Sequence, residues 1–206
     1  MNKWPGRLVK QSFDVLLSAL LLLLLSPLML LIAVVLGLQG GPIIFSHQRV
    51  GQGGRLFPCY KFRSMIPNAE EHLQRLLKTF PALRTEWERE RKLKYDPRVT
   101  RLGAFLRRTS LDELPQLFNV LRGEMSLVGP RPVVGEELAK YGSSAVYYLM
   151  AKPGITGLWQ VSGRNDINYR HRVRLDSLYV KKWSPSSDFS ILFRTVGVVL
   201  GRNGAY

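Results

Sequence analysis

Near its middle the chain reads Arg107-Arg108-Thr109-Ser110-Leu111-Asp112-Glu113-Leu114-Pro115-Gln116. Ser110 is a residue type that favours a helix N-cap, and Glu113 follows it at the spacing of a capping box. We therefore expect a helix to begin here, with backbone donors and the positive end of the helix dipole around Asp112. This environment favours an ionised and oriented Asp112 carboxylate.

The same stretch has two interpretations. A capping box before an apolar run is ordinary in purely structural helices. A carboxylate beside guanidinium groups can instead bind a metal ion or attack phosphorus as a covalent nucleophile, while the arginines hold the phosphate oxygens. Because consecutive helical residues point about 100° apart, Asp112 and Glu113 would then need different roles. The local pattern leaves both interpretations open.

The composition indicates an anionic partner. The chain has 206 residues and a formal net charge of +15, with a pI near 10.4. Nucleic acid, a phospholipid surface and a phosphorylated substrate all fit such a charge, and composition alone does not rank them. The single cysteine, Cys59, excludes an internal disulfide, and we expect it to be a buried thiol rather than a nucleophile.

An uncharged apolar segment occupies residues 15–38, after the basic residues Lys3, Arg7 and Lys10. As a straight helix it would be about 36 Å long, enough to cross a hydrocarbon core of about 30 Å. It is too long for a cleavable signal peptide, and no small-residue cleavage site closes it. The segment therefore predicts membrane insertion.

Ser26 and Pro27 interrupt this segment in its middle. Proline removes a backbone donor and clashes with the preceding turn, and the serine hydroxyl can take over part of the freed hydrogen bonding. A kinked spanning helix and a helix that turns back are both possible. Basic residues on both flanks favour placing both ends in the cytoplasm. We predict a re-entrant helix-break-helix over residues 1–39.

The following residues predict a small β element and a helical insert. Apolar runs at residues 42–45 and 57–62 flank a Gly-rich turn, which indicates an antiparallel hairpin. Lys61 and Arg63 alternate with aromatic residues, so both cations are expected on one face of the second strand. Residues 66–95 are rich in Glu, Arg, Lys and Leu and predict surface helices.

The second half adds a rigid turn and two helices. Gly129-Pro130-Arg131-Pro132 predicts a turn that presents Arg131 on a fixed backbone. Residues 152–164 form a glycine-punctuated loop for which a structural and a functional role are equally open. Residues 173–180 and 189–200 have helical apolar spacing. The second of these helices fits either a membrane interface or ordinary core packing.

Several motifs together carry a family resemblance. They are Ser26-Pro27 within an apolar segment, Tyr60-Lys61-Phe62-Arg63-Ser64-Met65, Asp96-Pro97-Arg98-Val99-Thr100-Arg101, Thr109 to Gln116 as quoted, Ser126-Leu127-Val128-Gly129-Pro130-Arg131-Pro132 and Lys152-Pro153-Gly154-Ile155-Thr156-Gly157-Leu158-Trp159-Gln160. In this order they resemble the bacterial sugar transferases, the monotopic phosphoglycosyl transferases that act on polyprenyl phosphate. The resemblance covers nearly the whole chain.

The resemblance implies both a fold and a reaction. The fold is α/β, α-rich with a small antiparallel β element, with a re-entrant membrane helix and a cytoplasmic catalytic domain over residues 40–206 at the bacterial inner membrane. The reaction is Mg²⁺-dependent transfer of a sugar phosphate from a UDP-sugar to undecaprenyl phosphate. Asp112 would attack the β-phosphate, release UMP and hold the sugar phosphate covalently until the lipid phosphate takes it.

The resemblance also assigns residues. It implies that Asp112 and Glu113 are catalytic and contact Mg²⁺. The phosphate-binding candidates are Arg107, Arg131, Lys61 and Arg63, with Pro130 and Pro132 holding the turn near the nucleotide or phosphates.

The resemblance also bears on which sugar is transferred. The charged insert and the carboxy-terminal half resemble members that transfer galactose or glucose 1-phosphate in capsule, exopolysaccharide or O-antigen assembly. Many of these carry further membrane helices before the catalytic part, and this chain is expected to lack them. The alternative is a membrane-anchored, non-enzymatic basic module that binds anionic lipid or nucleic acid. We expect no nucleic-acid partner, since the sequence has no recognition motif or aromatic stacking platform.

Overall fold

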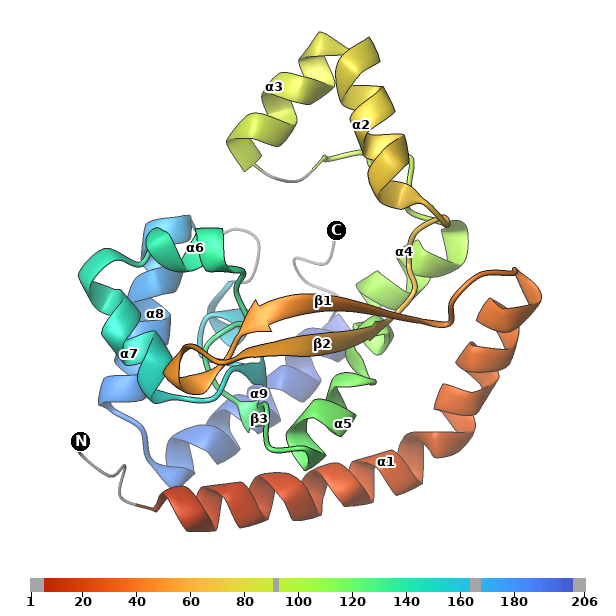
Figure 1. Cartoon of the computed structure of the whole chain (residues 1–206). Coiled ribbons are helices and arrows are strands. Elements are labelled where there is room, and N and C mark those ends of the chain that lie inside the picture. Colours follow the sequence, from red (N-terminus) through yellow and green to blue (C-terminus); the bar gives the residue numbers. More distant parts are fainter. Residues whose placement is uncertain (1–5, 91–92, 164–167, 202–206) are drawn as a thin grey trace.

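The first helix, α1 (Arg7–Leu38), runs along one side of the molecule and bends within its length. The computed structural model describes residues 6–90, 93–163 and 168–201. In Figure 1, α1 passes beneath the body of the protein and then turns upward beside it. The sequence predicted two helices separated by a break, whereas the structure has one bent helix with Pro27 inside it.

A hydrogen bond explains why the helix bends without breaking. Pro27 has no N–H to donate to the carbonyl of Leu23, four residues earlier. Ser26 Oγ donates to that carbonyl instead, at 2.8 Å. The carbonyl of Leu23 is therefore satisfied, and the helix continues through the proline.

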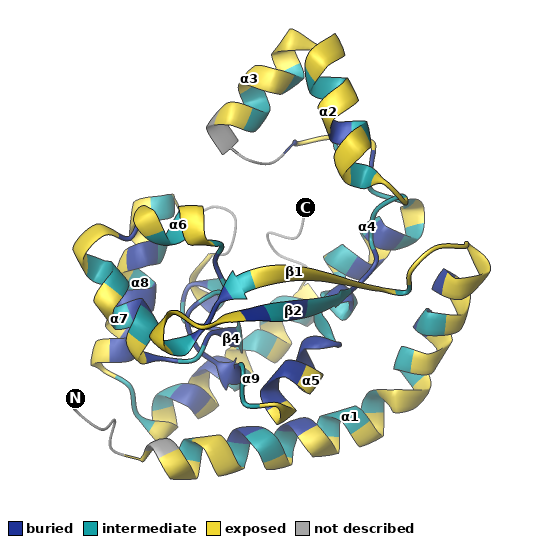
Figure 2. Ribbon diagram, viewed as in Figure 1, coloured by how far each residue is buried: buried dark blue, intermediate teal, exposed yellow. Residues whose placement is uncertain are grey.

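The outer face of α1 is apolar and exposed. Within the segment from Leu8 to Leu38, an 18-residue window has a mean hydropathy of 3.0, yet only 11% of that window is buried. Figure 2 shows exposed residues along this outer face. A core helix of a soluble protein would be covered, so the length, composition and exposure of α1 indicate membrane association.

The inner face of α1 is fixed to the body at both ends. Near its start, Lys10 Nζ lies 2.5 Å from Asp188 Oδ2, and Ser126 Oγ donates to Asp14 at 2.6 Å. Near its end, Leu36 packs in a cluster with Phe62 and Leu106. The apolar helix is thus attached directly to the elements that carry the site described below.

The predicted hairpin is confirmed, with a longer first strand. β1 (Ile44–Val50) and β2 (Leu56–Phe62) pair antiparallel and are joined by η1 (Gln52–Gly54). Asn119 closes the other edge of β2, because its Oδ1 accepts from the Tyr60 N–H at 3.1 Å and its Nδ2 donates to the Pro58 carbonyl at 2.8 Å. The hairpin is therefore tied to the helix that carries Asn119.

A short parallel pair lies in the core and was not predicted. β3 (Ser126–Val128) and β4 (Gly154–Thr156) pair parallel. The helices α5 (Gln116–Leu121), α8 (Tyr169–Lys181) and α9 (Pro185–Gly201) supply Leu117, Tyr179 and Ile191 to the core cluster around them. The α-rich class with a small antiparallel element is confirmed, as are the helices expected at residues 173–180 and 189–200.

The charged insert is a helical hairpin that projects from the body (Figure 1). It consists of α2 (Ala69–Thr79) and α3 (Pro81–Glu90), as the sequence predicted. At its base, Arg98 Nη2 lies 2.7 Å from Asp96 Oδ2, and the Arg98 guanidinium lies 5.4 Å from the Trp87 ring centroid. These contacts attach the hairpin next to α4 (Arg101–Arg108).

Helix α4 approaches the chain after β2 very closely. A Cβ added at Gly103 would lie 1.9 Å from the carbonyl oxygen of Ser64, so this contact requires glycine. The remaining short elements are η2 (Leu111–Glu113), α6 (Gly135–Ala139), η3 (Gly142–Ser144), α7 (Ala145–Met150) and η4 (Gln160–Ser162). The close approach brings the last turn of α4 beside the end of β2.

Candidate active site

The two adjacent acids lie on η2, between α4 and α5. Ser110, just before them, has a φ of 57° and makes no capping hydrogen bond with its side chain. The predicted capping box is therefore wrong: η2 is a single 3-10 turn, and α5 begins only at Gln116. The left-handed backbone at Ser110 is uncommon for a residue other than glycine and directs the chain into this turn. Glu113 is not a capping residue.

Lys61 connects both acids to the hairpin. Its Nζ lies 2.6 Å from Glu113 Oε1 and 3.8 Å from Asp112 Oδ2. The pKa of Asp112 is raised to about 6: burial is the largest cause and Glu113 adds to the rise, while Lys61 and Arg107 lower the pKa. The sequence predicted surroundings that favour an ionised Asp112, whereas in the structure desolvation dominates and raises its pKa above the usual value. At pH 7 a pKa of about 6 still leaves roughly nine-tenths of the carboxylate ionised.

Arg107 lies in the last turn of α4, and its positive charge lowers the pKa of Asp112. Its Nε donates to Ser64 Oγ at 2.9 Å. Burial lowers the pKa of Arg107, and the charges of Asp112 and Asp96 oppose that shift. Arg107 and Asp112 therefore affect each other's pKa, and the role of Arg107 in binding phosphate stays a prediction.

A pocket opens beside Glu113, with cations on several of its walls. Its lining residues are Arg49, Cys59, Lys61, Glu113, Gln116, Arg131, Pro132, Ile155 and Gln160. They come from β1, β2, η2, α5, the turn after β3, β4 and η4. Two of the predicted phosphate-binding residues, Lys61 and Arg131, therefore share one cavity with Glu113, and Asp112 lies beside it through its contact with Lys61.

Aromatic stacking and a buried acid hold Arg131. Its guanidinium lies 5.3 Å from the Trp159 ring centroid, and that of Arg172 lies 5.4 Å from the same ring. Asp176 is buried near both cations and accepts from Tyr141 Oη at 2.7 Å. Burial raises the pKa of Asp176 to about 7, and Arg172 and Arg131 counter this. The predicted rigid presentation of Arg131 thus involves side chains of α8.

The two prolines that flank Arg131 have different surroundings. Pro132 lines the pocket, whereas Pro130 is fully buried. The carbonyl of Pro130 accepts from the Gly154 N–H at 2.8 Å. Pro130 therefore belongs to the packing of β4 against the turn.

Arg63 does not join the pocket with Lys61. β2 ends at Phe62, and the Arg63 guanidinium turns to the end of α1, where Nη2 donates to the Leu36 carbonyl at 3.0 Å and Nη1 to that of Gly40. Basic side chains commonly satisfy the last carbonyls of a helix in this way. The expectation that Arg63 shares a strand face with Lys61 is wrong, and its role here is to close α1.

Comparison with known proteins identifies the family. The bacterial sugar transferase family matches residues 5–202. The chain belongs to this family. It is 57% identical to an undecaprenyl-phosphate galactose phosphotransferase of Salmonella typhimurium, over 100% of the chain and 43% of that protein. It is 51% identical to the exopolysaccharide production protein ExoY of Rhizobium meliloti, over 98% of the chain and 89% of that protein.

A third relative names a different sugar. The chain is 40% identical to a UDP-glucose:undecaprenyl-phosphate glucose-1-phosphate transferase of Xanthomonas campestris, over 94% of the chain and 39% of that protein. The chain thus spans less than half the length of the Salmonella and Xanthomonas relatives.

The acids of this sugar transferase fit a divalent cation that a substrate helps to hold. Among the residues that the structure describes, no group of three or more His, Cys, Asp and Glu side chains is arranged to bind a metal. Mg²⁺, however, commonly takes only one or two carboxylates together with substrate phosphates and water. Asp112 and Glu113 already share one cation, the Lys61 ammonium. The donor set therefore fits Mg²⁺ bound together with a diphosphate.

The sequence analysis did not assign five of the pocket residues to the site: Arg49, Cys59, Gln116, Ile155 and Gln160. Gln116 and Gln160 are the last residues of two quoted motifs, Thr109 to Gln116 and Lys152 to Gln160. Their place in these motifs could have indicated that they belong to the site. Gln160 Oε1 is buried and has no hydrogen-bond partner. Arg49 gave no local signal, because its place in the pocket depends on pairing between β1 and β2. Cys59 is buried, as expected, and burial raises the pKa of its thiol.

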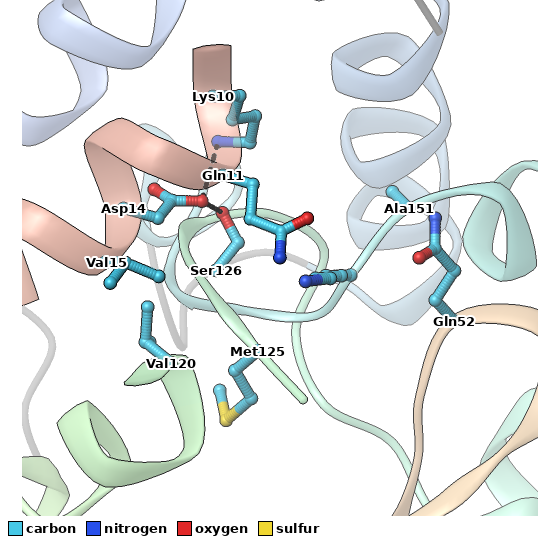
Figure 3. A pocket seen from close by; sticks show the side chains of 10 residues that line it. Lys10, Gln11, Asp14, Val15, Gln52, Val120, Met125, Ser126 and Ala151 are labelled. Atoms are coloured by element: carbon cyan, nitrogen blue, oxygen red, sulfur yellow. Dashed lines mark hydrogen bonds and ion pairs between the residues drawn. The ribbon is translucent and has the colours of Figure 1, made fainter. Parts of the chain in front are cut away.

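A second cavity lies away from the acids, beside the start of α1 (Figure 3). Its empty volume, which includes space open to solvent, is about 410 Å³, against about 300 Å³ for the pocket at Glu113. The lining includes Val15, Val120 and Met125, and its polar side is occupied by the contacts of Lys10 with Asp14 and of Asp14 with Ser126. Neither Asp112 nor Glu113 lines this cavity, so the smaller pocket is the better candidate for the chemistry.

Proposed function

We propose that this protein transfers a sugar 1-phosphate from a UDP-sugar to undecaprenyl phosphate, releases UMP and forms the undecaprenyl-diphosphate-linked sugar. The main support is the buried Asp112 with Lys61, Glu113 and Arg107 around it, beside a cationic pocket. The relatives named above are galactose and glucose phosphotransferases and an exopolysaccharide protein, which fits a hexose 1-phosphate and a first membrane step of capsule, exopolysaccharide or O-antigen assembly.

The proposed reaction has two displacements at one phosphorus atom. In the first, a carboxylate oxygen of Asp112 attacks the β-phosphorus, the bond from that phosphorus to the bridging oxygen breaks, and UMP leaves with the electron pair. In the second, an oxygen of the lipid phosphate attacks the same phosphorus, and the Asp112 carboxylate leaves. Arg107 and Arg131 would offset the charge of the phosphoryl oxygens during both displacements.

Asp112 and Glu113 would hold Mg²⁺ together with the substrate diphosphate. When bound, Mg²⁺ supplies several kcal/mol of charge stabilisation to the phosphoryl oxygens. Lys61 keeps both acids oriented in the pocket and contributes a positive charge of its own. Glu113, which is not a helix cap, is then available for the metal or for a proton.

The membrane arrangement is part of the proposal. We infer that α1 is re-entrant, that both of its ends lie on the cytoplasmic side, and that the site faces the cytoplasm. The support is the bend of α1 at Pro27, its exposed apolar face and the basic residues on both flanks. An inserted segment predicts that about 1 M salt leaves the protein on anionic vesicles, and complete release by salt would contradict it.

A donor and acceptor panel tests the reaction. The purified protein is incubated with UDP-galactose, UDP-glucose and their N-acetylated counterparts, with undecaprenyl phosphate and Mg²⁺. We expect UMP release with at least one hexose donor and a lipid product that depends on the acceptor. If no donor yields UMP or undergoes UMP exchange, the proposed function is wrong, and a non-enzymatic role takes its place.

A further inference from the structure

Two arginines face the same pocket from different parts of the chain. Arg49 lies near the end of β1, and Arg131 lies in the turn after β3. Burial lowers the pKa of the Arg49 guanidinium, and the positive charge of Arg131 lowers it further. Two like charges held together in a partly buried site oppose each other, and an anion between them removes that cost.

Among the acids that the structure describes near the pocket, the buried Asp176 lies close to Arg131 but is shared with Arg172, so it does not fully neutralise Arg131. Lys61 already contacts both Asp112 and Glu113. Arg49 Nη1 lies 3.7 Å from Glu137 Oε2, in a contact that is partly open to solvent. Such a loose, partly exposed ion pair contributes little and is easily exchanged for a stronger partner. A phosphate, with its fixed oxygens, is a stronger bidentate partner for guanidinium groups.

We propose that Arg49, together with Arg131, binds a second phosphate group, distinct from the phosphoryl group that is attacked, and that Glu137 pairs with Arg49 when this group is absent. The inference rests on the proposed function and deepens it. The second phosphate belongs either to the departing nucleoside monophosphate or to the lipid acceptor. Both have the same charge chemistry, and both must lie next to the transferred phosphoryl group.

Binding of UMP to the full chain is the first test. If the second phosphate is that of the nucleotide, Arg49→Gln is expected to weaken UMP binding about tenfold or more, which is the usual scale for one lost charge-assisted contact. Glu137→Gln keeps the acceptor oxygen but removes the competing charge, so it is expected to tighten UMP binding severalfold. Arg55→Gln removes an exposed charge from the same hairpin and is expected to change nothing. Calorimetric titration measures all three dissociation constants.

Transfer from a preformed adduct is the second test. Enzyme loaded with labelled sugar phosphate is freed of UMP and mixed with undecaprenyl phosphate in a single turnover. Weaker UMP binding with normal transfer assigns the second phosphate to the nucleotide, and slower transfer with normal UMP binding assigns it to the lipid acceptor. If Arg49→Gln changes neither measurement, or if Glu137→Gln weakens both of them as Arg49→Gln does, the inference is wrong.

These outcomes are separable from the failure of the proposed function. UMP binding needs no turnover, so the opposite effects of Arg49→Gln and Glu137→Gln can be measured even in a protein that transfers nothing. If Arg49→Gln does not fold, Glu137→Gln is measured alone in both tests: tighter UMP binding or faster single-turnover transfer supports the inference, and no change in either measurement overturns it.

Discussion

The ammonium of Lys61 lies 2.6 Å from Glu113 Oε1, although 52 positions separate the two residues in sequence. This ion pair joins β2 to η2 and fixes the turn that carries both acids. The same ammonium lies 3.8 Å from Asp112 Oδ2. Lys61 therefore helps to orient the proposed nucleophile and lowers its pKa against the larger effect of burial.

Replacing Asp112 by Asn is expected to abolish turnover without harming the fold. A neutral amide cannot form the acyl phosphate, so activity should fall by about three orders of magnitude or more. The folded-state pKa of Asp112 is raised to about 6, so above that pH the buried charge costs stability, and a neutral residue removes the cost. Thermal melting at pH 8 should show a stability equal to or above that of the wild type. Substantial residual turnover would exclude Asp112 as the nucleophile.

Replacing Glu113 by Gln is expected to reduce activity strongly with an intact fold. The contact of Glu113 is with Lys61 rather than with a helix start. Activity close to that of the wild type in Glu113→Gln would leave this residue without a chemical role.

The covalent intermediate can be tested without the lipid acceptor. With labelled UDP-sugar and Mg²⁺ but no lipid, the wild type should retain labelled sugar phosphate on Asp112, whereas Asp112→Asn should retain none.

The acid side of the pH profile should depend on Lys61. Turnover requires ionised Asp112, so kcat/KM should rise with pH through about 6 in the wild type. Lys61 lowers the pKa of Asp112, and in Lys61→Gln the rise should therefore move to higher pH. Arg55→Gln, which removes an exposed charge, serves as the control. If the pH at which kcat/KM rises is the same in Lys61→Gln as in the wild type, the rise reports the titration of a group other than Asp112.

The sequence predicted the elements that have strong local patterns. The hairpin, the charged insert and helices α8 and α9 have clear periodicity or turn residues. β3 and β4 have three residues each and are buried, so no alternation can appear in them. The capping box at Ser110 matched a valid local pattern, yet its left-handed backbone depends on how α4 and α5 pack around it.

The sequence analysis grouped correctly those residues of the candidate site that lie close together in one motif. Asp112, Glu113 and Arg107 lie within one stretch, so their proximity follows from the chain itself. Arg49 enters the pocket through strand pairing, and Arg63 leaves it because β2 ends one residue earlier. Such placements depend on tertiary contacts that a single sequence does not display.

Gly103→Ala should destabilise the protein, although alanine is the better helix former by about 1 kcal/mol. The new Cβ would lie 1.9 Å from the Ser64 carbonyl oxygen, so α4 must shift. We expect a loss of about 1–3 kcal/mol in unfolding free energy and lower turnover, since Arg107 would lose its contact with Ser64 Oγ. Gly197→Ala in α9, which meets no atom within 4 Å, is the matched control. Equal stability of the two variants would contradict the close approach.

The topology of α1 can be tested with single cysteines at positions 2 and 55, in a background where the buried Cys59 is replaced by Ser. Arg55 is exposed in the hairpin, beyond the end of α1. If α1 turns back at Pro27, both positions lie in the cytoplasm, and a membrane-impermeant thiol reagent should label neither in intact cells and both after permeabilisation. A spanning α1 would expose one of the two to the reagent. Replacing Pro27 by Leu restores the backbone donor and should shift the labelling toward that pattern if the proline directs the return of the chain.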